Sequence, residues 1–135
     1  KEIKFGLHKF SAYQMFAKKV LKSKIKLKEI FDKLKKNNKK IIGYGATAKS
    51  CTVLNYCNID KKYFQFFYDT TSFKIGKYLP GTKIKIKKYK KLKIKDTDYV
   101  FLGAWNFKEE IFEKEKSFIR NGGKFITHIP SPKII

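Results

Sequence analysis

The first forty residues carry apolar side chains at the spacing of an α-helix. Phe10, Tyr13 and Phe16 recur every three residues, and the apolar stripe continues beyond Lys24 until Asn37-Asn38, a pair typical of a helix stop. A stripe of this kind predicts a helix that packs against another part of the protein.

Beyond residue 38, short apolar runs alternate with helix-like runs, the pattern of a parallel sheet with crossover helices. In chain order, the predicted elements are strand 40–42, helix 47–56, strand 63–68, a half-exposed or edge strand 83–86, a helical turn 89–92, strand 99–102, helix 107–120 and strand 124–129. We therefore expect residues 1–38 to be a helical linker. Residues 39–135 are expected to form a small, doubly wound α/β domain whose mainly parallel sheet is flanked by helices.

The predicted helix 107–120 separates apolar from charged positions. Its core candidates are Phe107, Ile111, Phe112, Phe118 and Ile119. Its glutamates lie among lysines and indicate a solvated face, which consists of Glu109, Glu110, Glu113 and Glu115.

Composition limits the class of protein. The chain of 135 residues has 42% apolar side chains, enough for one core, and no apolar run reaches the roughly 20 residues of a membrane-spanning helix. The formal net charge is +22, but Arg120 is the single arginine and the lysines are spread along the whole chain. Because no apolar run is long enough, we expect no membrane as a partner. Because proteins that recognise a base sequence rely on arginine, we also expect no specific nucleic acid. A basic protein that binds nucleic acid without sequence specificity is kept as the third hypothesis, after the two that are given below.

Cysteine and histidine spacing gives no metal-binding pattern. Cys51 and Cys57 form no C-x-x-C pair, and His8 and His128 have no ligand partner at metal spacing. Two unpaired cysteines fit a reducing, cytoplasmic location. We expect no metal site and no catalytic residue in this chain. Its start at Lys1, without an initiator methionine or a signal peptide, predicts a piece of a longer protein.

A glycine-rich turn follows the first predicted strand and opens a helix. Gly43, Gly45 and Ala48 have the spacing G-x-G-x-x-A, at a position where backbone amides and the helix dipole bind phosphate. Lys49 and Ser50 add a cation and a hydroxyl. The alternative is a glycine turn that only lets strand and helix pack closely.

Two further loops lie at the same predicted edge of the sheet. Asp69 ends a strand where a dinucleotide-binding domain places the carboxylate that binds a ribose hydroxyl, and Lys74 follows in the same loop. Alternatively, Asp69 caps local amides. Trp105 and Asn106 come after another strand and suit stacking and hydrogen bonding to a sugar or base. Their alternative roles are a core tryptophan and a helix cap.

Five strings in the sequence together resemble one family. Their order and spacing are similar to those of the carboxyl-terminal domain of S-adenosylmethionine-dependent nucleotide-sugar C-methyltransferases, from about Phe10 to the end of the chain. The strings are residues 43–50 (GYGATAKS), 55–57 (NYC), 68–71 (YDTT), 79–81 (LPG) and 104–106 (AWN).

The resemblance implies a Rossmann-like domain that follows a zinc-binding domain and an S-adenosylmethionine-binding domain, both absent from this chain. The full-length enzyme would transfer a methyl group from S-adenosylmethionine to a carbon of a nucleoside-diphosphate keto-deoxysugar. A base of the middle domain would form the attacking enolate, so this chain alone is expected to be inactive and to need no cofactor of its own. The implied partners are the nucleoside-diphosphate sugar and the other domains of the same protein.

The resemblance also implies roles for individual residues. The turn that carries Tyr44, Thr47, Lys49 and Ser50 would face the diphosphate. The cleft toward the middle domain would be lined by Asn55, Lys74, Trp105 and Asn106. Gly45 and Asp69 complete the expected substrate-binding set. Cys51 and residues 72–77 depart from the family's pattern, which leaves the preferred nucleotide and sugar open.

The main alternative is an independent module that binds a dinucleotide or nucleotide. It is motivated by the G-x-G-x-x-A turn and by Asp69. Preferential binding of a nicotinamide dinucleotide over sugar nucleotides would favour it.

Overall fold

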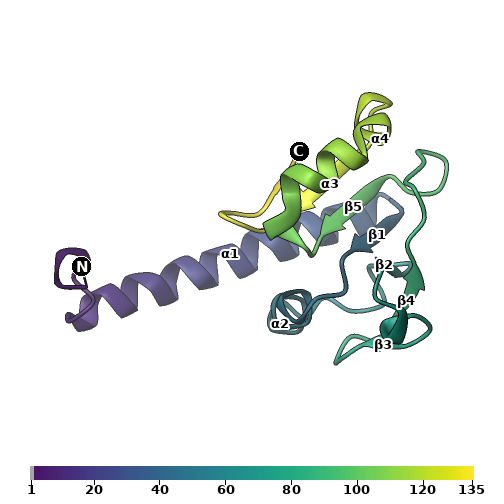
Figure 1. Cartoon of the computed structure of the whole chain (residues 1–135). Coiled ribbons are helices and arrows are strands. Elements are labelled where there is room, and N and C mark those ends of the chain that lie inside the picture. Colours follow the sequence, from purple (N-terminus) through teal and green to yellow (C-terminus); the bar gives the residue numbers. More distant parts are fainter. Residues whose placement is uncertain (1) are drawn as a thin grey trace.

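The computed structural model describes residues 2–135 and places a long helix beside a seven-stranded sheet (Figure 1). Residue 1, the start of the predicted linker, lies outside the described residues. The helices are α1 (Phe10–Lys36), α2 (Ala48–Tyr56), α3 (Lys108–Lys114) and α4 (Lys116–Arg120), and the 3₁₀ turns are η1 (Ile3–Phe5), η2 (Ser72–Lys74) and η3 (Trp105–Phe107). The strands are β1 (Ile41–Tyr44), β2 (Phe67–Asp69), β3 (Tyr78–Leu79), β4 (Ile84–Lys88), β5 (Tyr99–Leu102), β6 (Lys124–Thr127) and β7 (Lys133–Ile134).

The sheet has the strand order β3-β4-β2-β1-β5-β6-β7. The five inner strands are parallel, whereas β3 and β7 pair antiparallel at the two edges. Counted over the inner strands alone, the order is that of a doubly wound sheet, with the strand order reversing between β1 and β5. The predicted α/β fold class is confirmed.

Alternate residues of the central strands face two separate cores. Ile41 and Phe101 point to the face that α2 and the second half of α1 cover. Ile42 and Val100 point to the opposite face, which α3 and α4 cover. Burial on both sides explains why these strands read as unbroken apolar runs in the sequence.

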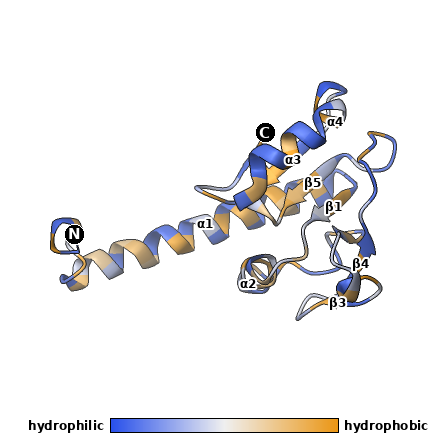
Figure 2. Cartoon of the chain, viewed as in Figure 1, coloured by the Kyte–Doolittle hydropathy of each residue, from blue (hydrophilic) through white to orange (hydrophobic). Residues whose placement is uncertain are grey.

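Helix α1 is anchored by its second half only. Leu27, Phe31 and Leu34 are buried against the sheet, whereas Phe10 and Phe16 are exposed. The first half of the helix extends away from the sheet and carries apolar positions along its length (Figures 1 and 2). The periodicity therefore predicted the helix correctly, but the described residues give the first half of its apolar stripe nothing to pack against.

Three predicted elements differ from the structure. Residues 63–66 are an irregular segment and not part of a strand; Phe64 is buried there, with its ring 5.2 Å from that of Phe31, whereas Gln65 is exposed. Residues 89–92 form an irregular connection in place of the helical turn. Beyond residue 127 the chain turns back, so that β7 pairs with β6 where a strand to residue 129 was expected.

The predicted helix 107–120 is interrupted at Glu115. The backbone leaves helical geometry there, at φ −102° and ψ 18°, and the side chain is fully buried. Glu115 is thus no part of a solvated face. Phe107 and Ile119, two of the expected core residues, are exposed. Phe107 lies in η3 ahead of α3, and Ile119 lies beside the face on which Ile111, Glu115 and Phe118 are buried at steps of four and three residues.

Candidate functional site

The turn after β1 is built for close packing against the end of β5. Gly45 has φ +85°, which favours glycine, and a Cβ placed there would lie 2.6 Å from the Cβ of Ala104. Thr47 then caps α2, since its hydroxyl accepts the amide of Ser50 at 3.1 Å. The sequence alternative of a tightly packed glycine turn therefore describes this geometry.

Ser50 and Lys49, the predicted phosphate-binding residues in the first turn of α2, point to different surroundings. Ser50 is fully buried, and its hydroxyl donates to the carbonyl of Gly45 at 2.9 Å. Lys49 is exposed. Within residues 2–135, the hydrogen bonds at this helix end engage the amides of Thr47 and Ser50, which leaves the amides of Ala48 and Lys49 open to a ligand.

Asp69 ends β2 and binds two backbone amides. Its Oδ2 accepts the amide of Ala46 at 2.8 Å, and its Oδ1 accepts the amide of Thr71 at 2.8 Å. Burial disfavours the ionised carboxylate, but these hydrogen bonds and the nearby Lys74 outweigh it and lower the pKa of Asp69. The carboxylate is therefore engaged in the turn. A dinucleotide site requires a carboxylate that is free to bind ribose hydroxyls, and Asp69 is not.

Lys74 reaches the same turn from η2. Its Nζ donates to the carbonyl of Ala46 at 2.9 Å and lies 3.5 Å from Oδ2 of Asp69. The side chain is partly buried, so the ammonium group is held in a fixed place beside the start of α2.

These residues surround a cleft of about 260 Å³ at the carboxyl ends of β1, β2 and β5. The site is where a doubly wound sheet binds its ligands. Five of the predicted substrate-binding residues line it, namely Tyr44, Gly45, Thr47, Asp69 and Lys74.

Other residues that line the cleft were not singled out from the sequence. Tyr68 belongs to a strand end where the parallel-sheet argument points, so that signal was available. Tyr89 and Lys114 come from the connection after β4 and from the end of α3. Tyr89 was missed because its segment was predicted as a helical turn, and Lys114 because its helix was predicted to expose a charged face.

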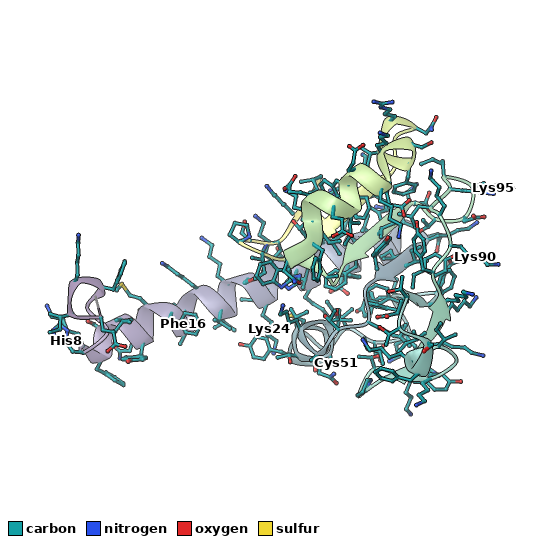
Figure 3. The ribbon with its side chains drawn as sticks, in the orientation of Figure 1. His8, Phe16, Lys24, Cys51, Lys90 and Lys95 are labelled. Carbon is teal, nitrogen blue, oxygen red and sulfur yellow. The ribbon has the colours of Figure 1, made fainter. Side chains whose placement is uncertain are left out.

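Lys49, Trp105 and Asn106 form a separate cluster outside this cleft. The Nζ of Lys49 lies 5.3 Å from the ring centroid of Trp105 and 3.4 Å from Oδ1 of Asn106. Lys49 and Trp105 line an apolar groove of about 710 Å³ between α1 and α2, to which Phe16 and Lys24 also contribute (Figure 3). These predicted ligands therefore meet one another, but not Asp69 and Lys74.

Asn55 lies in neither place as a free ligand. Its Nδ2 donates to the carbonyls of Cys51 at 2.8 Å and Pro80 at 3.0 Å. Gly81 packs directly against it, since a Cβ at Gly81 would lie 2.0 Å from Oδ1 of Asn55. The side chain joins the end of α2 to the loop after β3.

Residues 2–135 contain no group of three or more His, Cys, Asp or Glu side chains that could hold a metal ion. Cys51 and Cys57 are free thiols, and burial raises the pKa of both. No helix in the described part of the chain has both the length and the apolar character to cross a membrane.

Comparison with known proteins identifies similar chains. Residues 1–130 match the model of the family described as C-methyltransferase C-terminal domain. Over 130 residues the chain is 35% identical to the C-methyltransferase NovU of Streptomyces niveus. That match covers 96% of this chain and 31% of the relative, so the chain spans less than a third of the relative's length.

Proposed function

The chain belongs to the family of C-methyltransferase C-terminal domains, and from this premise we propose that it is the substrate-holding domain of an S-adenosylmethionine-dependent enzyme. The substrate class is a nucleoside-diphosphate keto-deoxysugar that is methylated at a carbon. The full-length protein is the enzyme, and this chain alone is inactive.

The cleft between the ends of β1, β2 and β5 carries the proposal. The fixed ammonium group of Lys74, which lines the cleft, suits a diphosphate. The aromatic rings of Tyr44 and Tyr89 suit a sugar ring. At about 260 Å³, the cleft is smaller than the roughly 300–1,000 Å³ of sites that enclose a whole ligand, so a second surface must complete it.

The cofactors implied by the family do not fit the residues of this chain. Asp69 is engaged by two amides, so it does not offer the ribose contact that S-adenosylmethionine or a nicotinamide dinucleotide would need. We therefore assign S-adenosylmethionine, zinc and the catalytic base to parts of the protein outside this chain. This domain contributes by holding the sugar nucleotide in place, which provides proximity without proton transfer.

The second surface of the site is proposed to belong to the same protein. Phe10, Tyr13 and Phe16 on α1 are more than half exposed, and α1 also borders the apolar groove with Trp105. An exposed apolar stripe of this size is typical of an interaction surface. The remaining two thirds of a protein as long as the relative NovU would provide the partner. We place the assembled enzyme in the cytoplasm because the two thiols of this chain are free.

A binding panel on this chain tests the proposal. Thermal unfolding and calorimetry are measured with dTDP, UDP, GDP and CDP, with their sugar conjugates, and with NAD and S-adenosylmethionine. Two salt concentrations separate binding in the cleft from the non-specific attraction of anions to a chain of net charge +22. We expect one sugar nucleotide to stabilise the chain selectively at both salt concentrations.

A matched pair of variants locates the binding. Lys74→Met is expected to abolish the stabilisation, whereas Lys77→Met removes the same charge from an exposed position of the same loop outside the cleft and leaves it unchanged. Stabilisation by NAD alone would favour the dinucleotide-binding alternative. Equal losses in the two variants would indicate non-specific anion binding and contradict the proposal.

A further inference from the structure

The apolar stripe of α1 stays on one face of the helix from its first half into its second. Tyr13, Phe16 and Val20 follow one another at steps of three and four residues, and Leu27 lies seven residues beyond Val20. Steps of three, four and seven residues return to the same side of an α-helix. The face that packs on the sheet at Leu27 is therefore the same face that lies open at Phe16, which is 67% exposed.

The apolar groove adjoins this open face. Phe16 and Val20 line it from α1, Tyr56 from α2 and Trp105 from η3. Because Phe16 and Val20 belong to both the stripe and the groove, the two form one continuous surface. We name it the α1–α2 surface, and it consists of Phe10, Tyr13, Phe16, Val20, Tyr56 and Trp105.

Two ammonium groups lie in the groove without an anionic partner. The Nζ of Lys24 lies 4.5 Å from the ring centroid of Tyr56, and that of Lys49 lies 5.3 Å from the ring centroid of Trp105. Each ring attracts its ammonium group and favours that position. Among the ion pairs of residues 2–135, none includes either lysine. A carboxylate that enters the groove from outside would therefore meet two positioned cations.

The charge along α1 indicates which kind of surface can cover it. Residues 4–28 contain eight lysines and no carboxylate. A second copy seated on the stripe would bring two such segments together, and the juxtaposition of like charges costs free energy. An acidic surface has the opposite effect. The match to this chain spans 31% of the relative NovU, so a protein of that length has room for such a surface outside this chain.

The groove lies close to the cleft at the strand ends. Thr47 lines the cleft, and Lys49, two residues further along the chain, lines the groove. A body that is seated in the groove therefore stands at the rim of the cleft, where the proposed function requires a second surface.

We propose that the α1–α2 surface is the docking site for an apolar patch, flanked by Asp or Glu side chains, on the part of the same protein that lies outside this chain. This inference rests on the proposed function and names the chemistry of the partner that it requires. It assigns Lys49 and Trp105 to docking in place of the substrate contacts expected from the sequence.

Hydrogen exchange of this chain and of the full-length protein, both without ligand, tests the docking. In this chain the first half of α1 has few buried contacts among the described residues, so its amides should exchange rapidly. In the full-length protein we expect residues 10–24 to exchange about tenfold more slowly or slower still. Equal rates in the two proteins would overturn the inference.

Two pairs of variants separate the apolar and the charged contributions. Phe16→Ser removes an exposed ring of the groove, and its control Met15→Ser changes a side chain that is 59% exposed and lies outside the groove. Lys49→Glu reverses a charge in the groove, and its control Lys95→Glu reverses an exposed charge far from Phe16 (Figure 3). We expect Phe16→Ser and Lys49→Glu each to reduce the protection of residues 10–24 about tenfold, and the controls to leave it unchanged. Equal effects of Lys49→Glu and Lys95→Glu would contradict an acidic partner.

Carbodiimide cross-linking of the full-length protein identifies the occupant. The reagent joins an amine to a carboxylate in contact with it and takes up the water that is lost. We expect Lys24 and Lys49 to be joined to Asp or Glu outside this chain, and the exposed Lys90 and Lys95 not to be. Protection of α1 in this chain alone, through a dimer seen in sedimentation or on phosphatidylglycerol vesicles, would overturn the inference.

The docking and the proposed function fail in different experiments. If a sugar nucleotide binds selectively but α1 is equally unprotected in the full-length protein, the docking alone is wrong. If α1 is protected but no sugar nucleotide binds, the proposed function alone is contradicted.

Discussion

The carboxylate of Asp69 accepts the amide of Ala46 at 2.8 Å, so the end of β2 holds the turn that follows β1. The two segments are neighbours because β1 and β2 pair in parallel and end at the same edge of the sheet. Asp69 occupies the position expected for a residue that binds ribose, but it shapes the cleft by holding the backbone of the neighbouring turn.

Replacing Asp69 with Asn should destabilise the fold and change its response to acid. The folded-state pKa of Asp69 is lowered, so its carboxylate contributes stability above the unfolded-state value near 3.8 and loses it as the pH falls through the lowered pKa. We expect Asp69→Asn to cost about 1–3 kcal/mol at pH 7, with a smaller difference from the unaltered chain below pH ~4. Urea unfolding at several pH values measures this.

The control for this prediction is Asp96→Asn, which changes an exposed carboxylate. It should leave the free energy of unfolding within about 0.5 kcal/mol of the unaltered chain. A difference between Asp69→Asn and the unaltered chain that persists undiminished at pH 3 would show that the carboxylate charge is not the cause.

Gly45→Ala tests the close approach of the turn to the end of β5. Gly45 and Gly122 have nearly the same φ, +85° and +88°, but a Cβ at Gly45 meets Ala104 whereas one at Gly122 meets nothing within 4 Å. Gly122→Ala should therefore cost only the left-handed conformation, about 1–2 kcal/mol, and Gly45→Ala clearly more. Equal urea midpoints for the two variants would mean that the turn relaxes away from Ala104.

His128 should make the fold sensitive to mild acid. It stacks on Phe101 at 5.4 Å, and burial lowers its pKa to about 4. Because the unfolded chain takes up this proton near pH 6.5, stability is complete above that pH and falls by about 2–3 kcal/mol as the pH approaches 4. His128→Phe should flatten the unfolding free energy over this range, and His8→Asn, at an exposed position, should not.

The sequence predicted the fold class and the central strands, because burial and chain order act on long segments. Strands such as residues 99–102 are buried on both faces, so their apolar runs predicted them and their parallel pairing. Glu115 was misread for the opposite reason. Its glutamate neighbours are exposed, and only the tertiary contacts of Tyr44, Tyr89 and Leu92 stabilise a carboxylate in the interior.

The candidate site was predicted in its location more than in its contacts. Strand order brings Tyr44, Asp69 and Lys74 to one edge of the sheet, as the alternation of elements predicts. Nothing in the sequence indicates that the Ser50 hydroxyl turns inward to Gly45, because that depends on the φ of the turn. The proposed contacts of these residues with a sugar nucleotide stay predictions.

Asn55 allows the structural and the substrate-binding interpretations of a predicted site residue to be separated. Its Nδ2 joins the carbonyls of Cys51 and Pro80, and its Oδ1 fills the space beside Gly81. We expect Asn55→Ala to cost about 1 kcal/mol of stability and to leave the affinity for any sugar nucleotide unchanged in this chain.

A double-mutant cycle makes this argument specific. We expect Gly81→Ala alone to be destabilising, because the added Cβ collides with the Asn55 side chain and the φ of residue 81 is +76°. With Asn55→Ala also present the collision disappears and the strain at φ remains, so the double variant should lose less stability than the two single changes added together. Strict additivity of the unfolding free energies would show that the two residues do not pack as described, and a large loss of ligand affinity in Asn55→Ala would restore its assignment to substrate binding.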